Sequence, residues 1–281
     1  MQFRKHVAIG LMAATAVVGA VATVPSAAGA AGVAPVPVVP VHVTNNGITV
    51  GAHNVITAGR TIFHVTTGKG VHQINIVKLK KGYSLPQFGQ DIGKAFGGDV
   101  KAINRVDRRT VLRGGTEAGP KNPGAFSANL PAGNFYFIDV NTNKLAAVKV
   151  VGKATPRKAI PNGGTIGLYT YGFVTNRPAL PHAGWVHLVN NADQPHFVQF
   201  QKVKESTTNA QVRKYFKNHA QGQPSFGLRP NFGTGVMTQG QNSDVYLNLP
   251  AGKYLVACFW PDFRTGMPHA FMGMWKLIHL K

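Results

Sequence analysis

The stretch "LPAGNFYFIDV" at Leu130–Val140 returns, with small changes, as "LPAGKYLVACF" at Leu249–Phe259. Two more blocks recur upstream in the same order, about 120 residues apart. They are "AGRTIFHV" (Ala58–Val65) with "AGWVHLV" (Ala183–Val189), and "HVTTGKGVHQINIVKLKK" (His64–Lys81) with "HLVNNADQPHFVQFQKVKE" (His187–Glu205). Three ordered matches at one spacing indicate an internal duplication. The sequence therefore predicts two domains that are built alike.

The duplication sets the expected domain organisation. The first copy covers residues 44–153 and the second covers residues 164–281. A linker with two prolines joins them at 154–163, and a Pro/Val/Ala spacer precedes them at 31–43. Residues 1–30 are expected to be a signal peptide.

Within each copy most segments are short and strand-like. "FVQFQKV", "DVYLNL" and "KYLVACFW" carry alternating or continuous apolar runs between Gly, Pro and Asn turns. One helix per copy is expected, at Ser84–Phe96 and at Thr207–His219, each beginning near a Ser or Thr that can cap it. About 110 residues of short strands with one inserted helix are typical of a β-sandwich. The predicted fold class is all-β, with two tandem β-sandwich domains that each carry one short inserted helix.

The first 30 residues have the form of an export signal. Arg4 and Lys5 lie in a short basic start, an apolar run continues to about Val24, and Ala28–Ala30 forms a small-x-small cleavage motif. The run is also long enough for an uncleaved anchor helix. Its Ala, Gly and Thr content and the cleavage motif favour a removed signal peptide. We therefore expect a secreted, extracellular protein whose mature form has no transmembrane segment.

The charge of the chain is strongly positive, with 30 Lys and Arg residues against 9 Asp and Glu residues. Loss of the two basic signal residues leaves 28 against 9, or +19. Such a charge favours anionic partners, and we expect an acidic redox partner or an anionic cell-wall polymer. The basic residues are spread out, with modest clusters only at Val77–Lys81 and Arg105–Arg113, and no nucleic-acid motif accompanies them. Solubility alone is the other explanation of this charge.

Cys258 is the only cysteine of the chain, which excludes an internal disulfide. In an exported protein a single cysteine is an inert core residue, an intermolecular bridge or a metal ligand. His269 follows eleven residues later and Met274 five residues beyond it, while His196 follows the turn "NNADQPH". A thiolate, two imidazoles and a weak thioether are the donor set of a blue-copper site. The alternative is that these residues only fill the core.

The motifs "NNADQPH" and "C…H-AFM-GM" resemble the cupredoxin superfamily, in which one His follows an "N…PH" turn and the other ligands lie on a C…H…GM loop. The resemblance implies Greek-key β-sandwich domains and one type 1 copper held by His196, Cys258, His269 and axial Met274. The same stretch is similar to secreted actinobacterial cupredoxin-like proteins. The ten residues between Cys258 and His269 make this loop longer than in small electron carriers, with "PDFRTG" as an inserted turn. Rival axial candidates are Met272 and Met267.

The first copy lacks this ligand set. His72 aligns with His196, but Asp139 aligns with Cys258, and Thr142 and Ala147 fall near the other two ligand positions. The sequence therefore predicts that the first copy keeps the fold without binding metal.

Two functions remain open at this level. The first is a secreted cupredoxin-like protein that binds one type 1 copper in its C-terminal domain for electron transfer or copper handling, and that is not an enzyme. The trinuclear site of a multicopper oxidase needs His-x-His pairs, and this sequence has none. The second copper of a nitrite reductase needs a His beside the Cys, but Cys258 lies between Ala257 and Phe259. The second is a metal-free β-sandwich module that attaches to anionic cell-wall or surface material.

Overall fold

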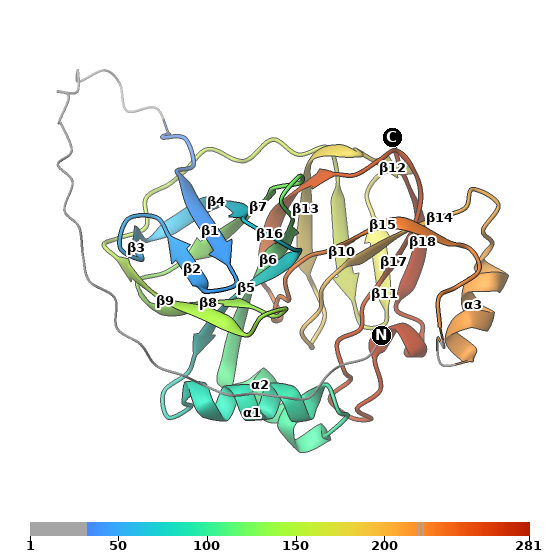
Figure 1. Cartoon of the computed structure of the whole chain (residues 1–281), viewed down its shortest axis with the longest axis horizontal. Coiled ribbons are helices and arrows are strands. Elements are labelled where there is room, and N and C mark those ends of the chain that lie inside the picture. Colours follow the sequence, from blue (N-terminus) through green and yellow to red (C-terminus); the bar gives the residue numbers. More distant parts are fainter. Residues whose placement is uncertain (1–32, 219, 221) are drawn as a thin grey trace.

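Short strands dominate the computed structural model, which describes residues 33–218, 220 and 222–281 (Figure 1). The predicted signal peptide at 1–30 lies outside the described residues. The strands of the N-terminal half are β1 (Val38–Thr44), β2 (Gly47–Val50), β3 (Val55–Thr57), β4 (Gly59–Thr67), β5 (His72–Leu79), β6 (Thr110–Ala118), β7 (Gly124–Leu130), β8 (Gly133–Asp139) and β9 (Lys144–Val151). Those of the C-terminal half are β10 (Thr165–Tyr169), β11 (Gly172–Thr175), β12 (Ala179–Leu180), β13 (Ala183–Asn190), β14 (Gln199–Val203), β15 (Gly227–Gly233), β16 (Asn242–Asn248), β17 (Gly252–Ala257) and β18 (Trp275–Leu280). The helices are α1 (Leu85–Ala95), α2 (Val100–Arg109), α3 (Asn209–Lys217) and the short 3-10 helix η1 (His269–Met272).

The two halves have the same strand order. The N-terminal half has one sheet of order β2-β1-β4-β7 and another of order β3-β9-β8-β5-β6. The C-terminal half repeats this with β11-β10-β13-β16 and β12-β18-β17-β14-β15. Each strand in the second set is the strand nine positions later in the chain. The predicted fold class, all-β with two tandem β-sandwiches, is confirmed.

The strand register also repeats residue for residue. In the N-terminal half Asn75 pairs with Ile138, and in the C-terminal half Gln199 pairs with Ala257. These four positions are the ones that the sequence matches align. The two "LPAG" segments therefore precede equivalent strands, β8 and β17, as the duplication requires.

The halves join at an edge and at a face. Strands β7 and β16 pair antiparallel, so four strands from each half form one eight-stranded sheet. Beside it, the segment 234–238 of the C-terminal half lies against β6, where the N–H of Gly235 donates to the carbonyl of Gly115 at 2.9 Å. A Cβ on Gly235 would lie 2.2 Å from the Gly115 nitrogen, so only glycine permits this approach.

The core of the N-terminal half lies between its two sheets. Phe63 of β4 contacts Phe126 of β7 and Phe137 of β8, with ring centroids 5.3 and 5.1 Å apart. All three rings are fully buried. Because one comes from each of three strands, they fix how the sheets pack on one another.

Two predicted helices are confirmed, each with the capping that the sequence suggests. Ser84 caps α1 in a capping box with Gln87, and Thr208 caps α3 in the same way with Gln211. Within the described part of the chain, no helix is long and apolar enough to cross a membrane.

Two expectations were wrong. Residues 38–43 of the predicted spacer (31–43) belong to the first domain, because Val38–Thr44 forms β1, which pairs with both β2 and β4 and buries Val41 and Val43. The N-terminal half also carries a second helix, α2, which begins after Asp99 caps its first N–H groups. Its buried face of Ala102, Ile103 and Val106 packs inward, so the first copy has two inserted helices rather than one. The predicted linker, 154–163, contains no helix or strand.

Candidate metal centre

Three separate segments bring His196, Cys258 and His269 together. His196 exchanges two backbone hydrogen bonds with Met237, at 3.0 and 2.8 Å, just before β14 begins. Cys258 is the residue that follows β17, and His269 is the first residue of η1. The N–H of Ala270 donates to the Cys258 carbonyl at 2.7 Å, which ties η1 to the end of β17.

The side chains of these three residues converge. The Cys258 sulfur lies 3.6 Å from Nδ1 of His196 and 3.7 Å from Nδ1 of His269. All three ligand atoms lie within 4.8 Å of one another, and each residue is 0% exposed. Among the described residues this is the only group of three such side chains that could hold a metal ion. The convergence predicted from the sequence is present.

The spacing fits a soft metal ion. Metal–sulfur bonds of about 2.3 Å and metal–nitrogen bonds of about 2.0 Å, set about 120° apart, place sulfur and nitrogen about 3.7 Å from each other. The two observed sulfur–nitrogen distances are 3.6 and 3.7 Å. The donor set and its size therefore suit a copper ion, and a copper site fits here.

A hydrogen-bond chain fixes which nitrogen of His269 can bind metal. The Asp262 carboxylate only accepts, so the Gln194 amide must point its Nε2 toward it, at 3.1 Å. Gln194 Oε1 then accepts from the Phe263 N–H at 3.0 Å and from Nε2 of His269 at 3.1 Å. Nε2 of His269 therefore carries the proton, and Nδ1 presents its lone pair to the cysteine sulfur.

Asp262 organises the loop that carries His269. Its Oδ1 accepts from the N–H groups of Arg264 and Thr265, at 3.0 and 2.8 Å, and from the Thr265 hydroxyl at 2.9 Å. Its Oδ2 also accepts from the Tyr171 hydroxyl at 2.7 Å, and the Tyr171 ring contacts the His269 ring with centroids 5.7 Å apart. "PDFRTG" is thus a turn, as predicted, and it is held by its own aspartate.

The sequence interpretation missed Gln194, Asp262 and Tyr171. Gln194 lies two residues before His196 in the quoted "NNADQPH" turn, and Asp262 lies in the "PDFRTG" turn, so both stood inside motifs already singled out. Tyr171 stands in the β10–β11 turn, where no motif marked it. Its position follows only from the folded arrangement.

Burial keeps the three ligand side chains neutral. Burial, together with the neighbouring His269, lowers the pKa of His196 to about 3. Burial lowers the pKa of His269 to about 4, against the opposing effect of Asp262. Burial also raises the pKa of the Cys258 thiol to about 12, against backbone hydrogen bonds at Phe197 and Trp260. Without metal the centre therefore holds two neutral imidazoles and a thiol at neutral pH.

Met274 is the best placed of the three axial candidates. It is 0% exposed, its N–H donates to the His269 carbonyl at 3.0 Å, and its carbonyl accepts from the Cys258 N–H at 3.2 Å. Met267 is 41% exposed. The Met272 sulfur accepts from the Thr265 hydroxyl at 3.7 Å instead. The backbone thus locks Met274 between the two other loop ligands.

The N-terminal half places a buried His–Asp pair at the equivalent position. Nδ1 of His72 lies 2.7 Å from Oδ2 of Asp139, and its Nε2 lies 2.7 Å from the Lys69 carbonyl. Both partners only accept, so both ring nitrogens carry protons and the ring is an imidazolium. The hydroxyl of Thr142 donates to the same carboxylate. The first copy thus has a His–Asp ion pair where the second copy has its metal-binding donors.

One alignment detail was wrong in this half. Asp139 pairs with Lys144 across β8 and β9, and Cys258 bonds to Met274 at the same place in the C-terminal half. Lys144, and not Ala147, therefore occupies the position of the axial methionine. The error arose because the loop between these strands is shorter in the N-terminal half, which shifts any alignment made by residue counting.

Comparisons with known proteins give only a distant likeness. No family model and no curated protein matches the chain. It is similar to reduced auracyanin from the photosynthetic bacterium Roseiflexus castenholzii, with 19% identity over 43% of this chain and 99% of that one, at a TM-score of 0.25. It is similar to auracyanin A, a "blue" copper protein from Chloroflexus aurantiacus, with 14% identity over 42% and 98%, at 0.24. It is also similar to copper nitrite reductase from Nitrosomonas europaea, with 10% identity over 88% and 94%, at 0.24. Likenesses at these TM-scores assign no function to the chain.

Proposed function

We propose that this protein binds one type 1 copper ion through His196, Cys258 and His269, with Met274 as a weak axial ligand, and that it passes single electrons. The observation that carries the proposal is the buried Cys258 sulfur, which lies 3.6 and 3.7 Å from the two imidazole nitrogens. A thiolate and imidazoles bind both copper(I) and copper(II), so a bound ion would supply one-electron oxidation and reduction. The surrounding residues determine how well that chemistry works.

The protein's contribution is a rigid and dry site. The three equatorial residues are 0% exposed, so water is excluded from them. Gln194 holds the His269 ring in one tautomer, and backbone hydrogen bonds lock Cys258 to Met274 and Ala270. Donors that are held in place before binding need little rearrangement when the charge at the centre changes by one electron. This favours an electron carrier.

Titration with Cu(II) tests the proposal. We expect one equivalent to produce an intense absorption near ~600 nm, from charge transfer between thiolate and copper. Cys258→Ser should remove this band while the far-ultraviolet circular dichroism stays unchanged. His187→Gln is the matched control, because His187 bonds to Asp244 at 2.7 Å outside the site. A band that survives Cys258→Ser, or no band in the wild type, would disprove the copper proposal.

A metal-free binding module is the second candidate function. It is supported by the N-terminal half, which keeps the same fold around His72 and Asp139 without the soft ligands. In that case the excess of basic residues would attach the protein to an anionic cell-wall or surface polymer. Retention on such a polymer would then fall as salt rises, with or without copper. We propose secretion as the setting for either function, on the basis of the export signal in the sequence.

A further inference from the structure

The fold brings the two basic clusters of the sequence side by side. Strands β5 and β6 pair antiparallel, which places Lys78 opposite Val111. The N–H of Lys80 donates to the carbonyl of Arg109 at 2.9 Å, where α2 ends. The exposed cations of this region are Lys80, Lys81, Lys94, Lys101, Arg105, Arg108 and Arg109, and they form what we call the basic face.

Few negative charges oppose the basic face. Residues 80–109 contain seven Lys and Arg residues and three Asp residues, for a net charge of +4. Asp91 is buried and is held by Arg105 through both carboxylate oxygens, at 2.6 and 3.0 Å. Asp107 is partly buried beside Trp260, so Asp99 is the exposed carboxyl of this region. The charged groups that α1 and α2 present to solvent are therefore almost all cations.

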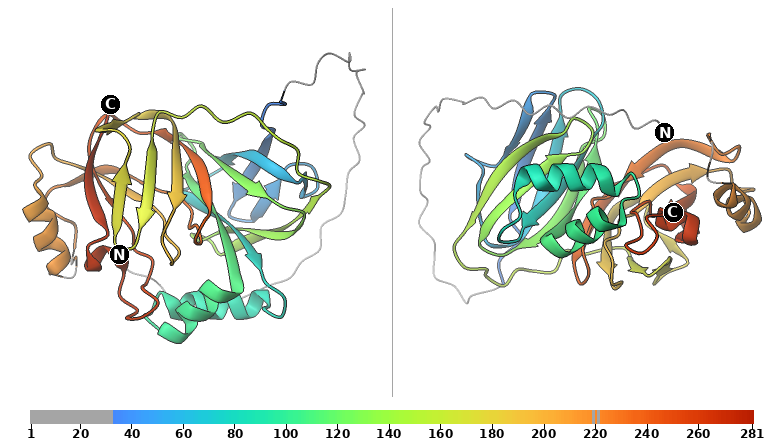
Figure 2. Two further views of the ribbon diagram at one scale, coloured as in Figure 1. Left: turned by 180° about the vertical axis from the view of Figure 1, so that it is seen from behind. Right: turned by 90° about the horizontal axis from the view of Figure 1, so that it is seen from below.

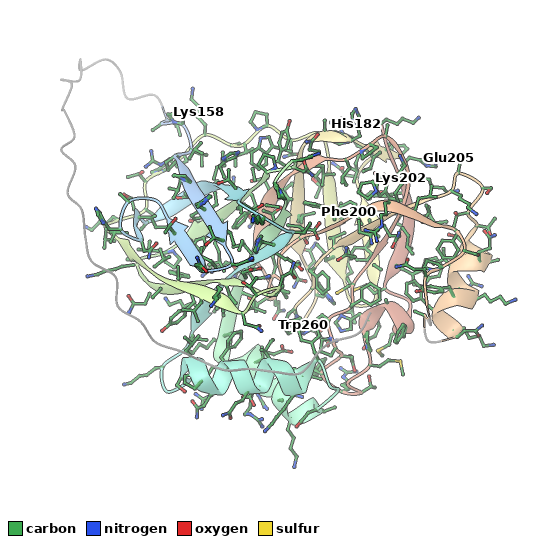
Figure 3. All side chains as sticks on the ribbon, viewed as in Figure 1. Lys158, His182, Phe200, Lys202, Glu205 and Trp260 are labelled. Atoms are coloured by element: carbon green, nitrogen blue, oxygen red, sulfur yellow. The ribbon has the colours of Figure 1, made fainter. Side chains whose placement is uncertain are left out.

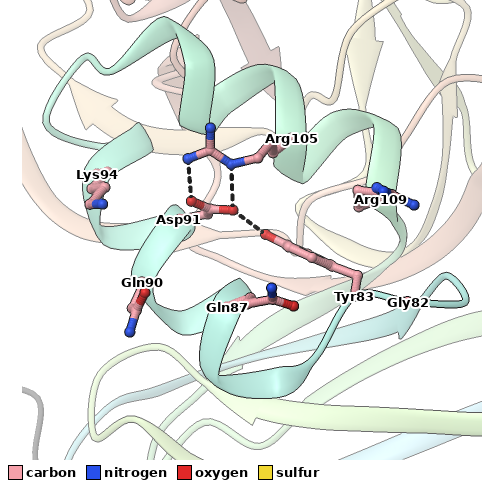
Figure 4. A pocket seen from close by; sticks show the side chains of 8 residues that line it. All are labelled: Gly82, Tyr83, Gln87, Gln90, Asp91, Lys94, Arg105 and Arg109. Atoms are coloured by element: carbon pink, nitrogen blue, oxygen red, sulfur yellow. Dashed lines mark hydrogen bonds and ion pairs between the residues drawn. The ribbon is translucent and has the colours of Figure 1, made fainter.

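The basic face contains a cavity of about 290 Å³ between α1, α2 and the turn before α1. Figure 4 shows Lys94 and Arg109 on either side of the Asp91–Arg105 pair, with Gln87 and Gln90 along α1. The Tyr83 hydroxyl also donates to Asp91, so the carboxylate in the cavity is already satisfied. A carboxylate from outside would be attracted by the cations on either side and could accept hydrogen bonds from the glutamine amides.

The other side of the same helices packs on the loop that carries the metal ligands. Asn104 of α2 donates to the Phe263 carbonyl at 2.7 Å, and the Phe263 ring packs against Ala95, Ala102 and Ile103. Both views of Figure 2 show the turquoise helices beside the red loop of the C-terminal half. The helices that carry the basic face thus pack directly against the loop that carries the candidate metal ligands.

An aromatic contact links the basic face to the cysteine. Trp260 follows Cys258 by two residues, and its ring meets the Phe96 ring edge-on with centroids 5.6 Å apart. Trp260 is 1% exposed and lies between the strands and helices α1 and α2 (Figure 3), whereas Phe96 is 47% exposed. Phe96 stands between Lys94 and Lys101 in the sequence. Since the equatorial ligands are fully buried, a partner must reach them through intervening groups such as these rings.

We propose that the basic face docks an acidic electron-carrier protein, with a partner carboxylate in the cavity between Lys94 and Arg109 and Phe96–Trp260 as the path to Cys258. This inference rests on the proposed copper function. One electron leaves the reduced partner and converts copper(II) to copper(I), so the partner is oxidised by one electron. An anionic wall polymer would suit the same charges, but it would have no use for an aromatic path to the cysteine.

The test compares two charge-reversed variants with copper bound. Lys94→Glu with Arg109→Glu changes the last turns of α1 and α2, and Lys214→Glu with Lys217→Glu changes the last turn of α3 as the matched control. Loss of the blue band is followed after mixing with hexacyanoferrate(II), an anionic one-electron donor. At low salt we expect the first variant to react at least about fivefold more slowly and the control to change less than about twofold, with the difference lost near ~1 M salt. Phe96→Leu should also slow the reaction.

A binding measurement on the copper-free protein completes the test. Poly-L-glutamate imitates an acidic protein surface, and we expect the first variant to bind it about tenfold more weakly than the control does. The proposal is overturned if Phe96→Leu reacts at the wild-type rate. It is also overturned if the first variant loses binding to poly(glycerol phosphate) but reacts with hexacyanoferrate(II) at the wild-type rate, because the face is then a polymer anchor. If no blue band forms at all, the copper function fails, yet weaker poly-L-glutamate binding by the first variant still supports an acidic-protein docking surface.

Discussion

Asp107→Asn tests the contact between the two halves beside the candidate metal centre. Asp107 lies on α2, next to the buried Trp260 of the ligand-carrying loop. Within the described residues, Oδ1 of Asp107 and Nε1 of Trp260 are both buried without a hydrogen bond. Burial raises the pKa of Asp107 to about 7, against the opposing effect of the Arg108 charge. The ionised carboxylate therefore destabilises the folded protein.

The size of this effect follows from the pKa. The usual value for Asp is 3.8, so a folded pKa of about 7 is a shift of about 3 units. At about 1.4 kcal/mol per unit, the full shift corresponds to ~4 kcal/mol. Because Asp107 retains some solvent contact, we expect Asp107→Asn to remove about half of this free-energy cost, or ~2 kcal/mol. The free energy of unfolding at pH 8 should rise by this amount.

The sign of the pH dependence is fixed as well. The folded pKa lies above the unfolded one, so the folded state binds more protons between about pH 4 and pH 7. The extra proton binding of the folded state stabilises the wild type fully below the unfolded pKa, and this stabilisation is lost as the pH rises through the folded pKa. Asp107→Asn does not titrate, so its advantage should be near zero at pH 4 and complete at pH 8.

Urea unfolding of the copper-free protein, followed by tryptophan fluorescence at pH 4, 6 and 8, measures this difference. Asp99→Asn is the control, because Asp99 is an exposed carboxyl on the same helix and Asn caps a helix as well as Asp does. It should change the free energy of unfolding by less than about 0.5 kcal/mol. A gain for Asp107→Asn that is equal at pH 4 and pH 8, or a loss at pH 8, would refute the reasoning.

Three further predictions concern the site and its counterpart. Met274→Leu should keep the blue band and raise the reduction potential, because loss of the axial thioether favours the reduced ion. Met272→Leu is the control and should leave the potential unchanged, and voltammetry of both variants measures the difference. Gln194→Leu should lower the stability of the copper-free protein by about 1–3 kcal/mol, since it leaves a buried imidazole N–H and a carboxylate without their partner, and urea unfolding measures the loss. His72→Leu should cost about 3–5 kcal/mol by leaving the Asp139 carboxylate without its counter-ion, and adding Asp139→Asn should restore part of it, because the amide is neutral and its oxygen can still accept from the Gln73 and Asn141 N–H groups. Although burial opposes protonation, the bond to Asp139 raises the pKa of His72, so the stability from this pair should be full below pH 6.5 and fall above it.

Much of the fold follows from the duplication alone. Matching "LPAGNFYFIDV" to "LPAGKYLVACF" aligned β8 with β17 at the register that the structure shows. Because the second copy repeats the first strand for strand, the apolar runs that predicted β14, β16 and β17 also predicted β5 and β8 through the sequence matches. The convergence of His196 and Cys258 also followed, since each lies beside the end of an aligned strand, whereas His269 lies in the loop between β17 and β18 and was predicted from the donor set and the cupredoxin resemblance.

The misses have physical causes. The Pro-rich start reads as a spacer by composition, yet alternation of Val39, Val41 and Val43 makes it a strand once a sheet is present to receive it. In the sequence, Arg105–Arg113 forms one basic cluster, but this stretch contains the end of α2 and the start of β6. Gln194 orients His269 from 75 residues away, and no local pattern encodes such a contact.

The comparison of the two halves explains how one scaffold tolerates both a metal-binding centre and its loss. At the His72–Asp139 position, a proton on the imidazole and the charge of the carboxylate cancel within a fully satisfied buried pair. At the Cys258 position, burial keeps the thiol and both imidazoles uncharged when metal is absent. Neither state buries a net charge, so neither pays the large cost of an unpaired ion in the core. The strands on either side need no rearrangement between the two, since the flanking residues pair in the same register in both halves.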